Sequence, residues 1–162
     1  FLNFSQLCKN IAINRFEDCV VAFNIALSNK TGVDIFNYQN LIPGGALHAC
    51  GPAVDYKDQP FQPVFRQAVL SYTMDDFIQQ FQLPMPHHIK LDVDGIERAV
   101  LEGADRALSQ RHIRSILVEL RDHDKDIVDL IKGKGFDFHS RFQQGPDDLH
   151  MYNYIFVKKD SL

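Results

Sequence analysis

The residues of this chain that could carry out chemistry are concentrated in one stretch, residues 88–97, with the sequence His-Ile-Lys-Leu-Asp-Val-Asp-Gly-Ile-Glu. It holds the ammonium group of Lys90 and the carboxylates of Asp92 and Asp94. A carboxylate can orient a hydroxyl group and remove its proton, and an ammonium group beside it can hold the pair in place. A further carboxylate, Glu119, ends another apolar run. These residues are our candidates for the chemistry of this protein.

A strand, a tight turn and a helix must position these groups. Ile89, Leu91 and Val93 alternate with Lys90 and Asp92, which is the two-residue period of a strand. Gly95 allows a sharp turn, and the D-x-x-E spacing of Asp94 and Glu97 is typical of a helix N-terminal capping box. A helix is expected from about Ile96 to Leu108. In open α/β sheets, ligands bind outside the carboxyl ends of strands, where this turn would lie.

The rest of the chain predicts an alternation of strands and helices. Helices are expected over 1–14, from about 73 to 81 with Thr73 as its cap, and over 124–134. Strands are expected over 19–25 (an apolar run buried on both faces), 33–38, 67–72, 113–120, a short piece near 136–138, and 151–158 as an antiparallel edge. Residues 39–63 read as a long loop, and 145–148 as a turn. The order predicts one α/β domain over residues 1–162, with a mostly parallel sheet and an antiparallel last strand.

Composition limits the classes of function. The net charge is -4, and no Lys/Arg cluster is present that would fit a nucleic-acid surface. No apolar run approaches the ~20 residues of a membrane span. The three cysteines lack metal-ligand spacing, and His48 and Cys50 have no third ligand nearby, so no metal site is expected. We expect a cytoplasmic protein with reduced thiols that binds neither nucleic acid nor membrane.

Two chemistries compete on the acidic turn taken alone. The stretch from Leu91 to Gly95 resembles the opening motif of haloacid-dehalogenase phosphatases, in which Asp92 would be the nucleophile and Asp94 the general acid/base. Ile96 stands where that motif has threonine. A D-x-D pair also occurs in metal sites of nucleotide-sugar glycosyltransferases, although that motif is short and common.

A third resemblance covers nearly the whole chain. Its most specific block is K-x-D-x-D-G-x-E-x-x-V-L-x-G-A at residues 90–104, and other segments agree in order and spacing: Phe4-x-x-Leu7-x-x-Asn10-x-x-x-Asn14, residues 26–32 (ALSNKTG), residues 44–46 (GGA), residues 73–77 (TMDDF) and residues 116–120 (ILVEL). Together they resemble the FkbM family of S-adenosylmethionine-dependent methyltransferases. Asp94 stands where the family usually has Glu.

The resemblance implies a Rossmann-like class I methyltransferase fold, truncated at its N-terminus, and O-methyl transfer to a sugar, lipid or polyketide-like acceptor. It implies catalytic roles for Asp92 and Lys90, cofactor contacts from Ala26, Leu27 and Asp92, and acceptor contacts from Asp94 and Glu119. The S-adenosylmethionine loop rich in glycine and the acidic residue that binds the ribose would both precede Phe1. The alternative is therefore a non-catalytic fragment or remnant without a cofactor site.

The same comparison predicts an open sheet edge. In this fold the strands that flank residues 89–93 on one side would come from the absent segment. An open strand edge is a template for pairing with another chain. We therefore expect either that the strand at 19–25 moves across to pair there or, preferably, that two chains associate.

Overall fold

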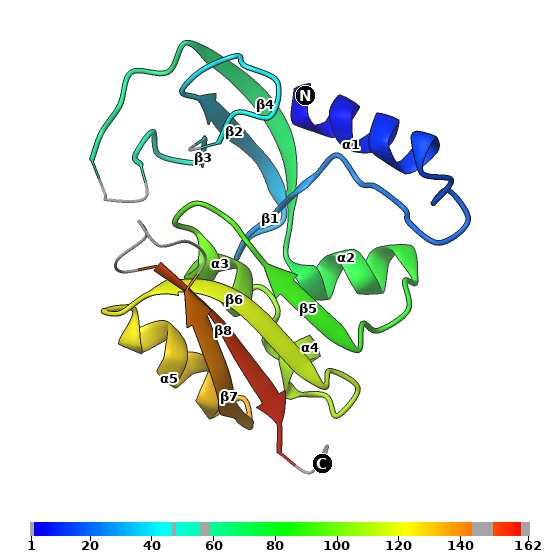
Figure 1. Cartoon of the computed structure of the whole chain (residues 1–162), viewed down its shortest axis with the longest axis vertical. Helices are drawn as coiled ribbons and strands as arrows, with labels where there is room; N and C mark the ends of the chain where they lie inside the picture. Colours follow the sequence, from blue (N-terminus) through cyan, green and yellow to red (C-terminus); the bar gives the residue numbers. More distant parts are fainter. Residues whose placement is uncertain (1, 47, 56–58, 144–150, 160–162) are drawn as a thin grey trace. The chain divides into compact units, whose positions relative to one another are not determined.

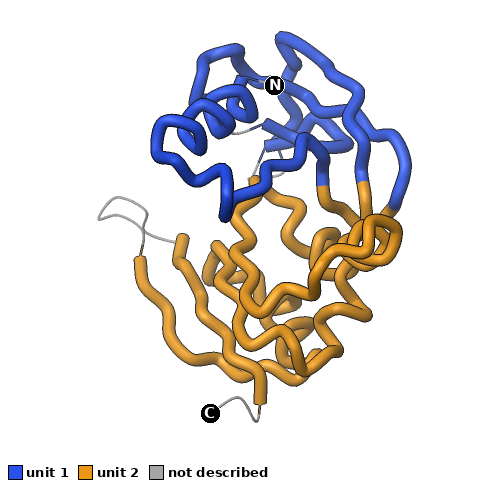
Figure 2. The backbone as a smooth tube through the Cα atoms, turned by 90° about the vertical axis from the view of Figure 1, so that its right-hand side faces the viewer, with its two compact units in different colours: residues 1–26, 31–71 blue, residues 27–30, 72–162 orange. Residues whose placement is uncertain are grey.

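The computed structural model describes residues 2–46, 48–55, 59–143 and 151–159. The chain forms two compact units, which Figure 2 colours separately. Unit 1 contains residues 1–26 and 31–71, and unit 2 contains residues 27–30 and 72–162. The elements in chain order are α1 (Leu2–Ile13), β1 (Ala26–Leu27), β2 (Gly32–Tyr38), β3 (Ala49–Cys50), β4 (Phe65–Tyr72), α2 (Met74–Phe81), β5 (His88–Leu91), α3 (Glu97–Glu102), α4 (Asp105–Ser109), β6 (Ser115–Arg121), α5 (Lys125–Gly133), β7 (Phe136–Gln143) and β8 (Met151–Lys158) (Figure 1).

Unit 1 is built on the antiparallel pairing of β2 with both β3 and β4. Its packing centres on Tyr38, which is 6% exposed and donates a hydrogen bond from its hydroxyl to Gln67 Oε1 at 2.8 Å. The ring centroids of Phe36, His48 and Phe65 lie 5.0, 5.0 and 5.6 Å from the ring centroid of Tyr38. Aromatic pairs at this separation contribute favourably to packing. The predicted strand at 33–38 and the predicted helix at 1–14 are confirmed.

Unit 2 contains a sheet in the order β5-β6-β8-β7. β5 and β6 are parallel, whereas β8 is antiparallel to both β6 and β7. One face of this sheet packs against the helices and forms the core. The core residues from the central strands include Ile116, Val118 and Phe156, each 0% exposed, and the helices contribute Leu101, Leu108 and Ile131. The two-residue alternation of β6 puts Leu117 and Glu119 on the opposite face.

The predicted mostly parallel Rossmann-like sheet is wrong. The structure has two mixed sheets in its place, the first ordered β1-β4-β2-β3 and the second β5-β6-β8-β7. The apolar run at 19–25 forms no strand, and its Val21 is 75% exposed. The strand expected at 33–38 pairs antiparallel with β4 in the first sheet, so it adds nothing to a parallel sheet. Strand β8 is antiparallel as predicted, but it lies between β6 and β7 and is not an edge.

Other predicted elements differ in their bounds. Helix α2 begins after Thr73, whose hydroxyl oxygen accepts a hydrogen bond from the Asp76 N–H at 3.0 Å, so the predicted cap is confirmed. The single helix predicted over 96–108 is divided into α3 and α4. The short strand predicted near 136 extends to Gln143. The turn predicted at 145–148 lies outside the described residues.

Close backbone contact explains the division of that helix at Gly103. A Cβ atom on Gly103 would lie 2.0 Å from the carbonyl oxygen of Ser28, so only glycine fits there. The Gly103 carbonyl accepts a hydrogen bond from the Asp75 N–H at 3.1 Å, outside its own helix. The segment that follows β1 is thereby packed directly against the end of α3.

Strand β5 lies at one edge of the second sheet. Within the described residues its partner strand is β6, which agrees with the expected open edge. It is four residues long and carries Lys90, two features that limit unspecific strand addition. Its sequence is nevertheless self-complementary. If two copies paired antiparallel about Leu91, Lys90 of each would lie opposite Asp92 of the other, and opposite charges across a strand pair are stabilising.

We therefore propose that two chains associate through β5 about a two-fold axis. Light scattering at micromolar concentration should give twice the monomer mass of 18.6 kDa. The variant Lys90→Asp should be monomeric because like charges would face each other, and the double variant Lys90→Asp/Asp92→Lys should dimerise again. A wild-type monomer under these conditions would contradict the proposal.

Candidate functional site

The carboxyl end of β5 holds the ion pair that the sequence predicted. Lys90 Nζ lies 2.7 Å from Asp92 Oδ2, and the two side chains are 63% and 47% exposed. The hydrogen bond that Lys90 donates to Asp92 raises the pKa of Lys90, and the negative charges of Asp92 and Glu119 add to this effect. The Lys90 ammonium group therefore remains protonated at neutral pH, and the Asp92 carboxylate remains open to solvent.

The parallel register brings Glu119 to the same place. Leu91 of β5 is aligned with Val118 of β6, so Asp92 and Glu119 are the next residues along neighbouring strands. Strands in a sheet lie about 4.8 Å apart. Because Lys90, Asp92 and Glu119 also share the face of the sheet that lies opposite the core, the structure brings these three predicted site residues together.

Asp94 and Glu97 have different positions from those that the capping-box spacing predicts. Asp94 is exposed in the turn, and Gly95 adopts the left-handed conformation with φ of 93°. The turn continues beyond Gly95, so that Ile96 is the N-cap of α3. The Ile96 side chain makes no cap hydrogen bond. The Glu97 carboxylate does reach back, accepting a hydrogen bond from the Gly95 N–H at 3.3 Å. The capping role predicted for Asp94 is wrong, and Glu97 holds the turn.

The remaining predicted residues lie elsewhere. Ala26 and Leu27 form the short strand β1, and Leu27 packs against the core of unit 2. His48 and Cys50 lie in unit 1, where the His48 Nδ1 accepts a hydrogen bond from the Gln39 N–H at 3.3 Å. Among the described residues, no group of three or more His, Cys, Asp or Glu side chains could hold a metal ion. No helix within the same residues is long and apolar enough to cross a membrane.

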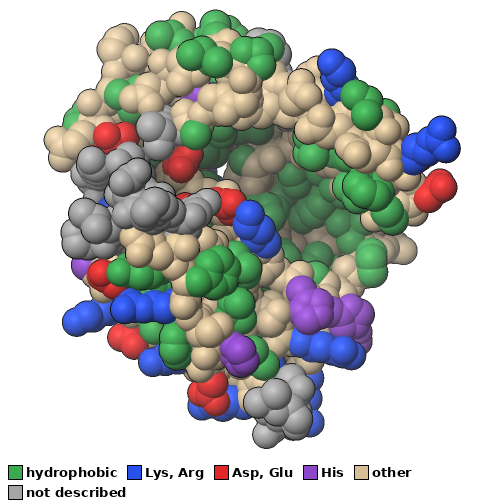
Figure 3. All heavy atoms as spheres, viewed as in Figure 1, with side chains coloured by type: hydrophobic (Ala, Val, Ile, Leu, Met, Phe, Trp, Pro, Cys, Tyr) green, Lys and Arg blue, Asp and Glu red, His purple; other side chains and the backbone are tan. Residues whose placement is uncertain are grey.

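Histidine side chains gather on part of the surface of unit 2 (Figure 3). The rings of His87 and His112 are 5.2 Å apart, and His88 Nδ1 lies 2.7 Å from Ser115 Oγ. His87 and His88 are at the start of β5, whereas Asp92 follows its end. They are therefore separate from the carboxyl-end site.

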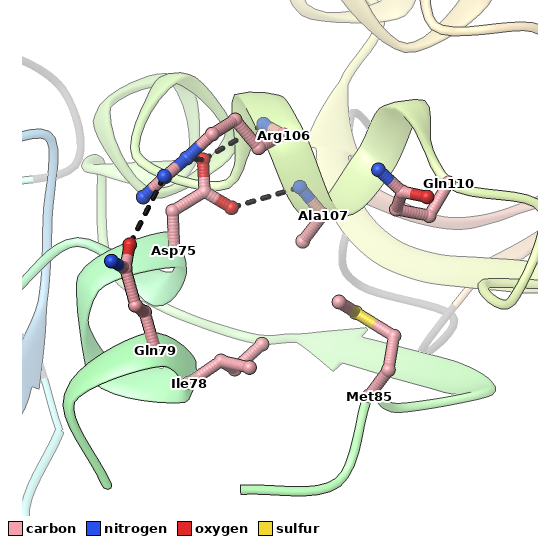
Figure 4. Close-up of a pocket in the computed structure, with 7 residues that line it drawn as sticks. All are labelled: Asp75, Ile78, Gln79, Met85, Arg106, Ala107 and Gln110. Atoms are coloured by element: carbon pink, nitrogen blue, oxygen red, sulfur yellow. Dashed lines mark hydrogen bonds and ion pairs between the residues drawn. The ribbon is translucent and has the colours of Figure 1, made fainter. Parts of the chain in front are cut away.

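A pocket of about 180 Å³ lies between α2 and α4 (Figure 4). The acidic residue that lines it, Asp75, has a side chain that is 11% exposed. The Asp75 carboxylate accepts hydrogen bonds from the backbone N–H groups of Arg106 and Ala107, each at 2.8 Å. The Arg106 guanidinium in turn donates to Gln79 at 3.1 Å. These polar groups join two helices, and the pocket also contains Met85, which precedes β5. We assign the pocket a structural role, because its polar groups bond one another and it lies toward the opposite end of β5 from Asp92.

One residue of the carboxyl-end site was missed by the sequence reasoning. Asn153 of β8 is directly opposite Glu119 of β6 in the antiparallel register, and it is 8% exposed. The signal was present in the chain, because Tyr152, Tyr154 and Phe156 alternate on the core face and so put Asn153 on the other face. The site therefore extends across three strands as a polar row of Lys90, Asp92, Glu119 and Asn153.

Burial of Glu97 leads to a prediction about stability and pH. Removal from water raises the pKa of its carboxyl group, and repulsion from Asp124 adds to this, although backbone hydrogen bonds partly offset the effect. A carboxyl group whose pKa is higher in the folded protein stabilises the fold below the unfolded pKa, about 4.3, and loses this contribution as pH rises through the folded pKa. Glu97→Gln should therefore raise the urea midpoint at pH 7 and leave it unchanged at pH 4.

The exposed Glu17 offers a matched control, and Glu17→Gln should leave the midpoint unchanged at both pH values. If Glu97→Gln lowered the midpoint at pH 7, the hydrogen bond to Gly95 would outweigh the cost of burial.

A family model described as Methyltransferase FkbM domain matches residues 1–154. No curated protein and no solved structure gave a match. The matched range covers most of the chain, including both partners of the ion pair and the whole polar row, and it supports a methyltransferase over a phosphatase of the haloacid-dehalogenase type. The chain belongs to the FkbM methyltransferase family.

Proposed function

We propose that this protein is an S-adenosylmethionine-dependent O-methyltransferase whose acceptor is a hydroxyl group of a sugar, lipid or polyketide-like molecule. Family membership indicates methyl transfer in general. The observation that supports a hydroxyl acceptor is the exposed Asp92 carboxylate, which is 2.7 Å from Lys90 at the carboxyl end of β5. Ligands of open α/β sheets bind at this end of the strands.

The residues of the site act mainly on the acceptor. Asp92 accepts the proton of the acceptor hydroxyl while the hydroxyl oxygen forms its bond to the methyl carbon. Lys90 holds the Asp92 carboxylate in one orientation, so that the carboxylate is already positioned to accept the proton of a bound hydroxyl group. Asp94 and Glu119 lie on either side, in the turn and on the next strand, and bind the remainder of the acceptor.

We assign three residues of the described chain to the proposed methyl donor. When bound, S-adenosylmethionine supplies an electrophilic methyl group on a sulfonium that leaves as a neutral thioether. Ala26, Leu27 and Asp92 would contact it, with Leu27 as an apolar surface and Asp92 as a hydrogen-bond acceptor. Two backbone contacts of the next residue hold Leu27 in place. The Ser28 N–H donates a hydrogen bond to the Tyr72 carbonyl at 2.9 Å, and the Ser28 carbonyl packs on Gly103.

A glycine-rich loop after a strand normally supplies many of the contacts to this donor. The one G-x-G sequence of the 162 residues, Gly133-Lys134-Gly135, lies at the end of helix α5 and does not follow a strand. We therefore expect the chain as given to bind S-adenosylmethionine weakly, and calorimetric titration should give a dissociation constant above the micromolar range. Micromolar affinity would show that the residues present are sufficient, and would contradict this expectation.

Asp92→Asn tests the catalytic role. Loss of a general base typically lowers the rate by about 10²–10⁴-fold. We expect a loss of this size for Asp92→Asn in a methyl-transfer assay. The assay uses millimolar S-adenosylmethionine, so that weak binding of the donor does not limit the rate. Thermal unfolding should change little, because exposed ion pairs contribute about 0–1 kcal/mol.

Asp126→Asn is the matched control, since Asp126 is also exposed and paired, with Arg98 at 2.6 Å, but lies on α5. It should keep full turnover. Near-normal turnover of Asp92→Asn would make the Lys90–Asp92 pair structural, and absence of turnover in the wild type with any hydroxyl acceptor would favour the non-catalytic alternative.

A further inference from the structure

Basic side chains gather at the N-terminal ends of β5 and β6, which is the opposite end of β5 from Asp92. The segments that contain these strand starts, residues 77–91 and 106–118, have no Asp or Glu but have four Lys or Arg and three of the seven His. The chain as a whole has a net charge of -4, so its positive charge is unevenly distributed. A local excess of one sign of charge attracts ligands of the opposite sign.

The pairing of β5 with β6 brings basic residues of both segments together. The Arg114 N–H donates a hydrogen bond to the His87 carbonyl at 2.7 Å, and the Arg114 carbonyl accepts one from the Lys158 N–H at 2.8 Å. The ring centroids of His87 and His112 are 5.2 Å apart. Figure 3 shows histidine side chains beside Lys or Arg side chains on the surface of unit 2. The strand pairing thus places an arginine and two histidines within one small area.

The two arginines of this area, Arg111 and Arg114, differ from the other arginines of unit 2. Each of the other four lies within 3.5 Å of a carboxylate oxygen, and these are Arg98, Arg106, Arg121 and Arg141. Neither Arg111 nor Arg114 forms an ion pair with a carboxylate of the residues that the structure describes, and both are exposed. Their guanidinium groups are therefore available to an anion from solution.

The donors of this area match a phosphate group better than a carboxylate. A guanidinium group donates two parallel hydrogen bonds to a phosphate and remains charged at all physiological pH values. An imidazole ring adds an N–H donor. A phosphate monoester presents three acceptor oxygens and a charge of about -2 near pH 7, whereas a carboxylate presents two oxygens and a single charge. Two guanidinium groups beside two imidazoles suit the larger charge and the larger number of acceptors.

We propose that His87, Arg111, His112 and Arg114 form a basic patch that binds the phosphate group of a small phosphorylated molecule. Two permanent positive charges are few for a nucleic acid or an anionic membrane, because binding to either depends on many contacts with phosphates. The inference is independent of the proposed methyl transfer, since the basic patch and Asp92 lie at opposite ends of β5.

The test titrates the full chain with two matched probes, glycerol phosphate and glycerol, at constant pH and ionic strength. NMR follows the ring protons of the histidines, which the variants His87→Gln and His112→Gln assign. Glycerol phosphate should shift the signals of His87 and His112 in a saturable way, and glycerol should not. The signal of His139, an exposed histidine on β7, should stay in place.

Arginine variants test whether the guanidinium groups hold the phosphate. Arg111→Gln and Arg114→Gln should each weaken glycerol phosphate binding about tenfold, the loss expected for a hydrogen bond to a charged group. Arg66→Gln is the matched control, because Arg66 is an exposed arginine of β4 and the variant changes the net charge equally. It should bind as the wild type does. All three variants should keep the wild-type melting temperature, since exposed side chains contribute little to stability.

Three results would overturn the inference. One is an equal response to glycerol and glycerol phosphate. Another is unchanged glycerol phosphate affinity in the double variant Arg111→Gln/Arg114→Gln. The third is binding to vesicles that contain phosphatidic acid, or to single-stranded RNA, without binding of glycerol phosphate, since this would assign the basic patch to a membrane or to a nucleic acid.

Discussion

The parallel pairing of β5 with β6 is the constraint on which the candidate site depends. Its register aligns Leu91 with Val118, and both side chains are buried in the core, at 5% and 0% exposure. A shift of β5 by one residue would turn Leu91 to the open face and bury Lys90. Burial of unpaired charges is far more costly than exposure of apolar groups. The core therefore fixes which carboxylates meet at the carboxyl end.

A second constraint acts on the other side of the core, at Gly103. The carbonyl of Ser28 approaches so closely that any side chain would collide with it. Asn29 strengthens this contact, because its Nδ2 donates to Glu102 at 3.3 Å. This explains in physical terms why a small residue follows the acidic block of the sequence. It also explains why one predicted helix becomes two short helices, since the chain must bend where the segment after β1 packs.

The charged residues of unit 2 divide into those that support the fold and those that remain available. Asp75 binds the first N–H groups of α4, and Lys158 binds carbonyls near the ends of α4 and α5, with its Nζ 2.5 Å from Leu108 O and 2.7 Å from Lys134 O. Burial lowers the pKa of Lys158, which also lies 4.4 Å from the Phe136 ring centroid. Charges placed at helix ends in this way complement the helix dipoles. By contrast, Lys90 and Asp92 are exposed and lie at an edge where strands end, so they are charged groups suited to binding.

The sequence by itself determined most of the local elements and the residues at the centre of the candidate site. Hydrophobic alternation was sufficient for β2, β5, β6 and β8, the Thr73 cap was sufficient for α2, and the Lys90–Asp92 pair follows from two residues on one face of a strand. Sequence patterns did not determine how the strands pair. The apolar run at 19–25 looks like a buried strand, but an apolar strand forms only where a neighbour offers backbone partners. Only the tertiary structure decided that the sheets are mixed, that α3 ends at Gly103, and that Asn153 from the far end of the chain lies beside Glu119, because each of these results depends on contacts between residues distant in sequence.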